Sequence, residues 1–300
     1  MMEMFQLDFM RIAFAMAVLI GLTAPVIGTF VVQRKMSLLG DGIGHIALTG
    51  IGLGLVTGSS PVLAALVVSV LGAVAIEALR ARSRSGADVA LAVLFYGGLA
   101  GGVVLTGREG GQVSLQSYLF GSISSVTATD LYIVAGLSAA VLLILAIFGR
   151  ELFLLCQDED LARAAGLPVR FLSVLIAATA AVTVVISMRA IGLLLVSALM
   201  IVPVAAAQQV ARGFLGTMLT AMAAGVLSAV TGLAGSYEYD LAPGPSIVLL
   251  ALAVFLAAVG TGTVLRRRRT ASAAARDARA ARRVDVRDVS MDAEPEVLGG

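Results

Sequence analysis

The sequence predicts an all-α polytopic membrane protein with about eight or nine membrane-spanning helices. Hydrophobic residues make up 59% of the 300 residues and charged residues only 13%, and the mean hydropathy is +1.00. A soluble domain carries roughly 25% charged residues. Long apolar runs recur along the chain, and runs of about 18 or more such residues can cross the roughly 30 Å of bilayer hydrocarbon as helices.

Nine apolar runs are long enough to be candidate spans, and the connections within 37–79 and within 169–209 are very short. Glycine pairs four residues apart, such as Gly40 and Gly44 or Gly98 and Gly102, predict close packing between helix backbones. The predicted spans are residues 10–32, 37–57, 61–79, 87–107, 128–149, 169–188, 191–209, 213–234 and 245–265.

The positive charges predict the orientation of these spans. If successive spans alternate in direction, 18 of the 21 Lys and Arg residues fall on one side, and Arg11, Arg108 and Arg189 fall on the other. Cytoplasmic loops carry an excess of Lys and Arg, so the crowded side is predicted to be cytoplasmic. Nine spans then place the N-terminus outside and the C-terminus in the cytoplasm.

Composition divides the chain into a transmembrane domain, 1–265, and a C-terminal tail, 266–300. The tail begins with basic residues, continues with alternating Ala, Arg and Asp, and ends acidic. Few hydrophobic and many charged residues predict a disordered cytoplasmic tail. A helix lying on the membrane surface fits the same composition.

The stretch MSLLGDGIGHIALTG, residues 36–50, places Asp41 and the chain's one histidine, His45, inside an apolar run. One helical turn separates them, so both side chains project from one face. Imidazole and carboxylate ligands suit divalent ions such as Zn²⁺ or Mn²⁺. Two ligands are too few for tight binding, so a symmetric partner or water would have to complete the shell.

A structural role for the same two residues stays open. Asp41 can cap the helix and pair with Arg34 or Lys35. His45 can donate a hydrogen bond to a neighbouring carbonyl. Ionisable residues within spans are nevertheless functional by default, because burying them is costly.

The segment LCQDEDLARAAGLPVRF, residues 155–171, is the longest polar interruption between predicted spans. Its acidic residues at 158–160 favour a helix start, and Gly166 followed by Pro168 favours a stop. A short helix at the cytoplasmic membrane surface would suit the docking of a soluble partner. A plain connector would have a similar sequence.

The segment SYEYDLAPGPSIVLL, residues 236–250, places Glu238 and Asp240 on the predicted outer side. Acidic residues at an external mouth can attract cations. Ordinary solvated loop carboxylates are the alternative.

Several function classes are excluded or disfavoured by the residues present. The chain has one lysine, one cysteine, Cys156, and no G-x-x-x-x-G-K-[ST] motif, so it is not itself a P-loop ATPase and forms no intrachain disulfide. A single histidine limits acid–base catalysis, and we predict no enzyme activity and no nucleic-acid partner. A secondary transporter or channel, the alternative of another class, should show an internal repeat and charged relays in several spans.

The chain resembles the permease subunits of zinc- and manganese-type ABC importers, the high-affinity zinc uptake membrane protein family. In that family a basic pair, Met-Ser, Gly-Asp and a His four residues later recur, as in GTFVVQRKMSLLGDGIGHIALTGIGLG (28–54). Further similar stretches follow in order: SYLFGSISSVTATDL (117–131), DLARAAGLPV (160–169), AIGLLLVSALMIVPVAAA (190–207) and APGPSIVLL (242–250).

The resemblance implies a type II ABC importer-like permease in a bacterial cytoplasmic membrane. The expected assembly is a permease homodimer with two copies of a cytoplasmic ATPase and an extracytoplasmic solute-binding protein. Asp41 and His45 match the family's Gly-Asp-x-x-x-His motif and would be transient metal ligands, two of each per dimer. Residues 158–168 match the coupling helix that seats in the ATPase, with Asp160, Ala164 and Gly166 as matching positions.

The expected substrate is Zn²⁺, with Mn²⁺ next and iron after it, and no tightly bound cofactor. An ABC permease for a metal chelate or cobalamin-like cofactor is the alternative, and it would need a wide cavity. The chain departs from the family at Ile46, where Ala is common directly after the histidine. Family members often have eight spans, so one of the nine segments is a candidate re-entrant or broken helix.

Overall fold

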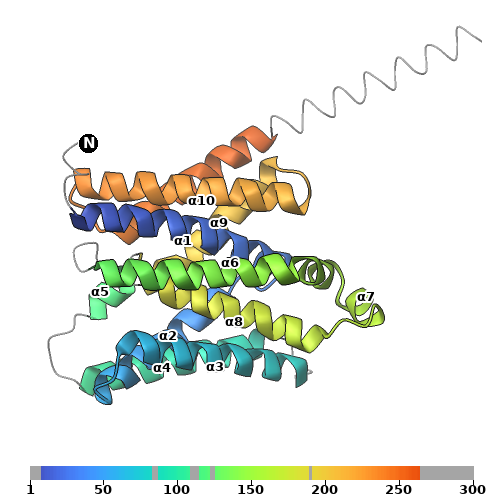
Figure 1. Ribbon diagram of the computed structural model, residues 1–300, viewed down its shortest axis with the longest axis horizontal. Helices are drawn as coiled ribbons and strands as arrows, with labels where there is room; N and C mark the ends of the chain where they lie inside the picture. The colour runs from blue at the N-terminus through green and yellow to red at the C-terminus, as the bar shows by residue number, and fades with distance from the viewer. Residues whose placement is uncertain (1–7, 83–86, 109–114, 122–125, 189–190, 264–300) are drawn as a thin grey trace, which may run out of the picture.

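The computed structural model describes residues 8–82, 87–108, 115–121, 126–188 and 191–263, which form a bundle of α-helices (Figure 1). No strand occurs among these residues. The helices are α1 (Asp8–Gln33), α2 (Leu39–Val56), α3 (Pro61–Arg82), α4 (Ala87–Arg108), α5 (Leu115–Phe120), α6 (Ala128–Gln157), α7 (Glu159–Ala164), α8 (Val169–Met188), α9 (Leu193–Val210), α10 (Gly213–Glu238) and a last helix, Pro243–Thr263.

Each of the nine predicted spans coincides with one of these helices, which confirms the all-α membrane fold. In the described residues, seven helices are long and apolar enough to cross a membrane. The other two predicted spans contain shorter apolar helices, Leu91–Gly107 within α4 and Leu195–Val210 within α9. The tail at 266–300 lies outside the described residues.

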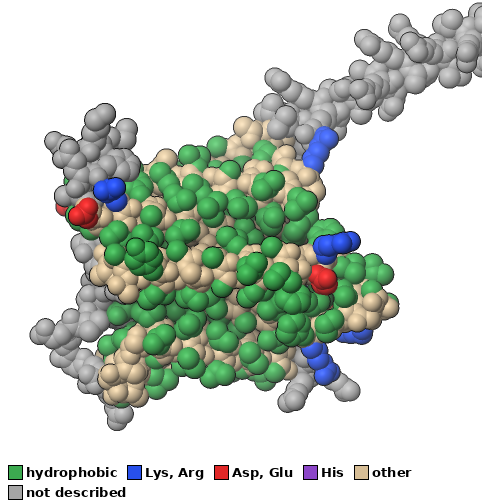
Figure 2. All heavy atoms as spheres, viewed as in Figure 1, with side chains coloured by type: hydrophobic (Ala, Val, Ile, Leu, Met, Phe, Trp, Pro, Cys, Tyr) green, Lys and Arg blue, Asp and Glu red, His purple; other side chains and the backbone are tan. Residues whose placement is uncertain are grey.

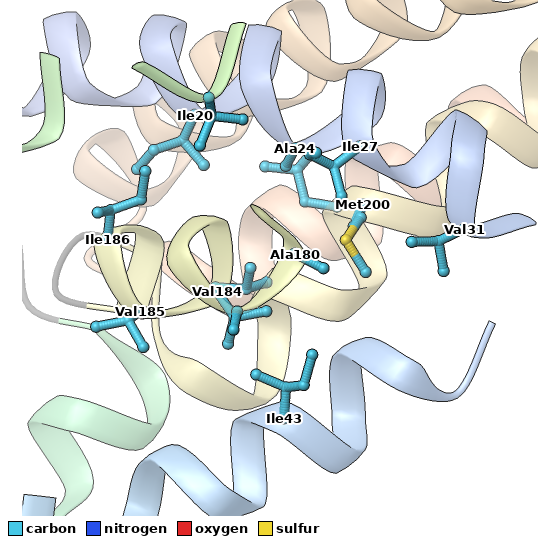
Figure 3. Close-up of a cluster of buried hydrophobic side chains, with 14 of the residues drawn as sticks. Ile20, Ala24, Ile27, Val31, Ile43, Ala180, Val184, Val185, Ile186 and Met200 are labelled. Atoms are coloured by element: carbon cyan, nitrogen blue, oxygen red, sulfur yellow. The ribbon is translucent and has the colours of Figure 1, made fainter. Parts of the chain in front are cut away.

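The core joins two groups of helices. α1 packs against α6, α8, α9 and α10, and α2 packs against α3, α4, α8 and α9. Figure 3 shows side chains from both groups meeting: Ile20 and Ile27 of α1, Val184 of α8, Met200 of α9 and Ile43 of α2. α8 and α9 therefore hold α2 at a fixed place in the bundle.

Hydrophobic side chains cover the flank of the molecule, whereas charged side chains gather at its two ends (Figure 2). Exposed apolar residues occur along the outer helices, for example Leu71 of α3, Leu143 of α6 and Leu219 of α10. A belt of this kind is the surface that lipid chains contact, because apolar side chains lose nothing by facing hydrocarbon.

Candidate functional site

Asp41 lies in the first turn of α2 but does not cap it. The cap position is Leu38, which makes no side-chain capping bond, and the helix begins at Leu39. Arg34, which that alternative named with Lys35 as a partner of Asp41, donates to Glu159 Oε2 at 3.1 Å instead. The capping alternative for Asp41 is therefore wrong.

His45 lies one turn further along α2, half-buried, with its ring against Phe95 of α4. The ring centroids are 4.1 Å apart at an interplanar angle of 66°. Among the described residues, His45 Nδ1 is buried without a hydrogen-bond partner, and Asp41 makes no hydrogen bond or ion pair. A buried polar atom left unpaired costs about 1–3 kcal/mol, so this is an environment in which a ligand can stabilise the pair.

The neighbouring helices fix the depth of the pair. A Cβ atom at Gly98 of α4 would lie 2.8 Å from the His45 carbonyl carbon, and Ile46 packs over Gly72 of α3. Gly72 and Gly98 lie near the middle of their helices. His45 is therefore close to mid-length in the bundle, and Asp41 lies about 6 Å nearer the end that carries α7.

Ile46, the departure from the family pattern, is directed at α3. Its side chain is 6% exposed, and its Cδ1 and Cγ2 atoms would each lie 2.8 Å from a Cβ atom at Gly72. The absence of a side chain at Gly72 provides the space that the extra carbons of Ile46 occupy.

A single chain offers two candidate ligands at this place. No group of three or more His, Cys, Asp or Glu side chains that could hold a metal ion occurs within the described part of the chain. α9 closes the side next to Gly40, where the Ser197 hydroxyl and the Met200 methyl group approach. The sequence analysis singled out neither of these α9 residues nor Phe95.

Two glycine pairs pack closely against neighbouring helices, as their four-residue spacing predicted. Gly98 and Gly102 of α4 admit the backbone of His45 and the side chain of Leu48, and Gly40 and Gly44 face α9. The Thr49 hydroxyl donates to the Gly98 carbonyl at 2.6 Å. α2 is thus held between α4 and α9 at van der Waals distance.

The predicted short helix at 158–168 is present as α7. Asp158 caps it, accepting hydrogen bonds from the backbone N–H groups of Asp160 and Leu161 at 2.8 and 3.0 Å. Gly166 ends it with φ +79°, a left-handed conformation that glycine adopts without strain. Asp160, Ala164 and Gly166 are all exposed.

Ion pairs attach the inner side of α7 to the helix bundle. Glu159 Oε2 lies 3.1 Å from Arg34 and 3.9 Å from Arg80 of α3, while Glu159 Oε1 lies 3.2 Å from Arg163. Arg34 also donates to Ser173 Oγ of α8 at 2.8 Å. These groups border a cavity of about 510 Å³ under α7.

Burial at this position imposes a desolvation penalty on the charged side chain of Arg34. Its side chain is 4% exposed, and burial, followed by the charge of Arg80, lowers the pKa of the guanidinium below its usual value. An arginine remains charged even so. The sequence analysis missed this network, since Arg34 and Glu159 are 125 residues apart.

The two predicted mouth residues lie far from this network. α10 runs antiparallel to α1, since Phe214 packs on Phe30 and Gly225 on Gly21. Glu238 at the end of α10 and Asp240 beyond it are both exposed, and they lie at the end of the bundle opposite α7. The structure does not bring them together with Asp41 and His45.

Comparison with known proteins identifies the family. The model of the ABC 3 transport family matches residues 6–262. The chain belongs to this family. Membership in the ABC 3 transport family confirms the resemblance found in the sequence. It makes the chain a multi-pass transport permease rather than an enzyme, because the ATPase of this family is a separate subunit.

Individual ABC 3 relatives are similar over most of their length. The chain is 35% identical over 254 residues to the manganese transport system membrane protein MntC of Halalkalibacterium halodurans, covering 84% of this chain and 87% of that protein. It is 32% identical over 257 residues to the chelated iron transport system membrane protein YfeD of Yersinia pestis, covering 86% of each. A solved structure, PsaBC from Streptococcus pneumoniae in complex with Fab, matches with 33% identity and a TM-score of 0.74, covering 84% of this chain and 91% of that one.

Proposed function

We propose that this chain is the membrane subunit of an ABC importer that carries a divalent transition-metal ion into the cell, with Asp41 and His45 as transient ligands. The observation that carries the proposal is the unpaired state of the two side chains. They lie one turn apart on α2, near mid-length of the bundle, and make no hydrogen bond among the described residues. A protein rarely leaves ionisable groups in that situation without a ligand to receive.

The ligand count supports a homodimer. One chain supplies one carboxylate and one imidazole, which is half of a four-ligand shell. A second copy related by a two-fold axis would supply the other half. Weak coordination suits transport, because an ion that is bound too tightly is not released.

Manganese is the substrate that the relatives favour, ahead of the zinc expected from the sequence. The 35% identical relative is named as a manganese transport protein. A mixed carboxylate and imidazole set accepts both ions, and zinc binds the same ligands more tightly. The YfeD relative is named for chelated iron, so a metal chelate is the second candidate substrate.

In this proposal the ATPase binds at one end of the molecule and the solute-binding protein binds at the other. Asp160, Ala164 and Gly166 on the outer side of α7 would seat in the cytoplasmic ATPase. Glu238 and Asp240 at the opposite end would form the external mouth, where a solute-binding protein delivers the metal. Opposite charge at the mouth would raise the local concentration of cations.

Metal uptake tests the ligand assignment. The chain is expressed with its ATPase and solute-binding protein in bacteria that lack their own manganese and zinc importers, and uptake of each radioactive metal is measured. We expect Asp41→Ala and His45→Ala each to lower uptake at least about ten-fold. Mutating a residue that only supports a metal ligand typically costs about 10- to 100-fold in metal affinity or activity, and removing the ligand itself should cost no less.

Thr49→Val is the matched control. Thr49 lies one turn beyond His45 on the same face of α2 and donates a hydrogen bond to Gly98, so its variant loses a polar group without losing a ligand. Uptake should stay within about two-fold of wild type, since one such bond contributes only about 1 kcal/mol. Uptake of both metals at wild-type level in the Asp41 and His45 variants, at equal expression, would rule out the ligand role.

A further inference from the structure

A cavity of about 790 Å³ opens on the outer surface of the bundle, between α6 and α10. These helices contribute the exposed Leu143 and Leu219 to the apolar belt. Both helices pack against α1, which lies between them in Figure 1 and forms the floor of the cavity through Val26 and Phe30. Small residues leave the space open: a Cβ atom at Gly149 of α6 would meet nothing within 4 Å. The cavity therefore lies at a place where lipid chains reach the protein.

The walls of this cavity are almost entirely apolar. They include Leu142 and Leu145 of α6 and Met218 and Met222 of α10. Phe214 closes the end, with its ring 5.1 Å from that of Phe30 and 4.9 Å from that of Phe153. Water has no polar partner along such walls, whereas a hydrocarbon chain fits them.

Two arginines stand at the same end of the cavity, Arg150 near the end of α6 and Arg212 directly before α10. Both are exposed, and neither forms an ion pair within the described residues. They differ in this from Arg34, Arg80 and Arg163, which border the cavity under α7 and all contact carboxylates. No acidic side chain of the described residues lines the cavity, so its charged end is positive.

We infer that this cavity binds an anionic phospholipid, with one acyl chain along the α6–α10 groove and the phosphate between Arg150 and Arg212. Guanidinium groups form charge-assisted, often bidentate hydrogen bonds with phosphate oxygens. Basic pockets between transmembrane helices on the cytoplasmic side are suited to anionic headgroups. The inference does not depend on which metal the protein carries.

Lipid titration of the purified full-length protein tests the inference. Phosphatidylglycerol or the zwitterionic phosphatidylcholine is added to the protein in detergent, and bound lipid is counted by native mass spectrometry. We expect phosphatidylglycerol to bind more tightly. The double variant Arg150→Gln/Arg212→Gln should weaken it about 25-fold, or about five-fold for each arginine, which corresponds to about 1 kcal/mol each.

Arg170→Gln is the matched control for charge. Arg170 of α8 is exposed, forms no ion pair among the described residues, and borders the cavity under α7 instead. Its variant should change phosphatidylglycerol binding by less than about two-fold, because an exposed charge outside a defined site contributes little. An equal loss in this control would overturn the inference.

The variant Ala146→Phe distinguishes the contribution of the acyl chain to lipid binding from that of the headgroup. Ala146 lines the groove on α6, so a phenyl ring there occupies the chain's space and leaves both arginines in place. Phosphatidylglycerol binding should fall, and inorganic phosphate, which lacks an acyl chain, should displace the lipid only at far higher concentration. Unchanged lipid binding in Ala146→Phe, or displacement by inorganic phosphate at the lipid's own concentration, would overturn the inference in favour of a simple anion site. Melting temperatures of all variants establish that they are folded.

Discussion

At the scale of single residues, the geometry of the proposed metal ligands depends on one glycine of the neighbouring helix. A Cβ atom at Gly98 would lie 2.7 Å from the Ile46 nitrogen and 2.8 Å from the His45 carbonyl carbon. Both are backbone atoms and cannot rotate away. Any side chain at this position therefore moves α4 relative to α2, and with it Phe95 relative to His45.

We expect Gly98→Ala to destabilise the protein by about 1–3 kcal/mol, the usual cost of overpacking, and to lower metal uptake. Gly97→Ala is the matched control, because a Cβ atom at Gly97 meets nothing within 4 Å. Melting temperature and uptake are measured for both. Equal stability of the two variants would show that α2 and α4 are less closely packed than the structure indicates.

The sequence predicted that Asp41 and His45 share one face of a helix, but not what surrounds them. The i, i+4 spacing of Asp41 and His45 is a local property, and the helix was recognisable from its apolar run. Phe95, Ser197 and the Arg34–Glu159 ion pair depend on how distant helices pack. No pattern within one segment carries that information, so the sequence offered Asp41 as a possible partner of Arg34 and did not point to Glu159.

At the scale of elements, α7 shows how a six-residue helix keeps a fixed place. Asp158 caps its first turn, its own Ala162 is fully buried against the bundle, and Glu159 forms ion pairs with Arg34 and Arg80. The start and the end of α7 were predictable from the sequence because capping residues and helix-ending glycines are local signals. α5 is equally short but lacks such signals, and its place next to α9, where Gly192 meets Phe120, arises from tertiary packing.

Gly166→Val tests the docking role proposed for α7. Valine at φ +79° is strained, since left-handed backbone costs an L-residue roughly 1–2 kcal/mol and a β-branched one more. We expect the end of α7 to move and the ATPase to be lost on co-purification. Ala165→Val is the control, because Ala165 is also exposed but has φ −75°. Full ATPase retention in Gly166→Val would favour a plain connector.

At the scale of the whole molecule, basic residues are concentrated at one end. The described residues at the α7 end include Arg34, Lys35, Arg80, Arg150, Arg163, Arg170 and Arg212, interspersed with acidic residues such as Glu77, Glu159 and Asp160, whereas the other end carries Arg11 and Arg108 beside Asp8, Asp130, Glu238 and Asp240. The last helix also runs between these ends, with Gly244 near Ile191 and Gly262 near Gln209 of α9. The positive-inside rule therefore predicts that the α7 end faces the cytoplasm.

Labelling of single cysteines tests this orientation. Cys156→Ala removes the one native thiol, and Asp240→Cys or Ala164→Cys then places a new thiol at an exposed position on either end. We expect a membrane-impermeant maleimide to label Asp240→Cys in intact cells, and Ala164→Cys only after permeabilisation. The reverse pattern would invert the topology, and it would also place α7 on the side where no ATPase can reach it.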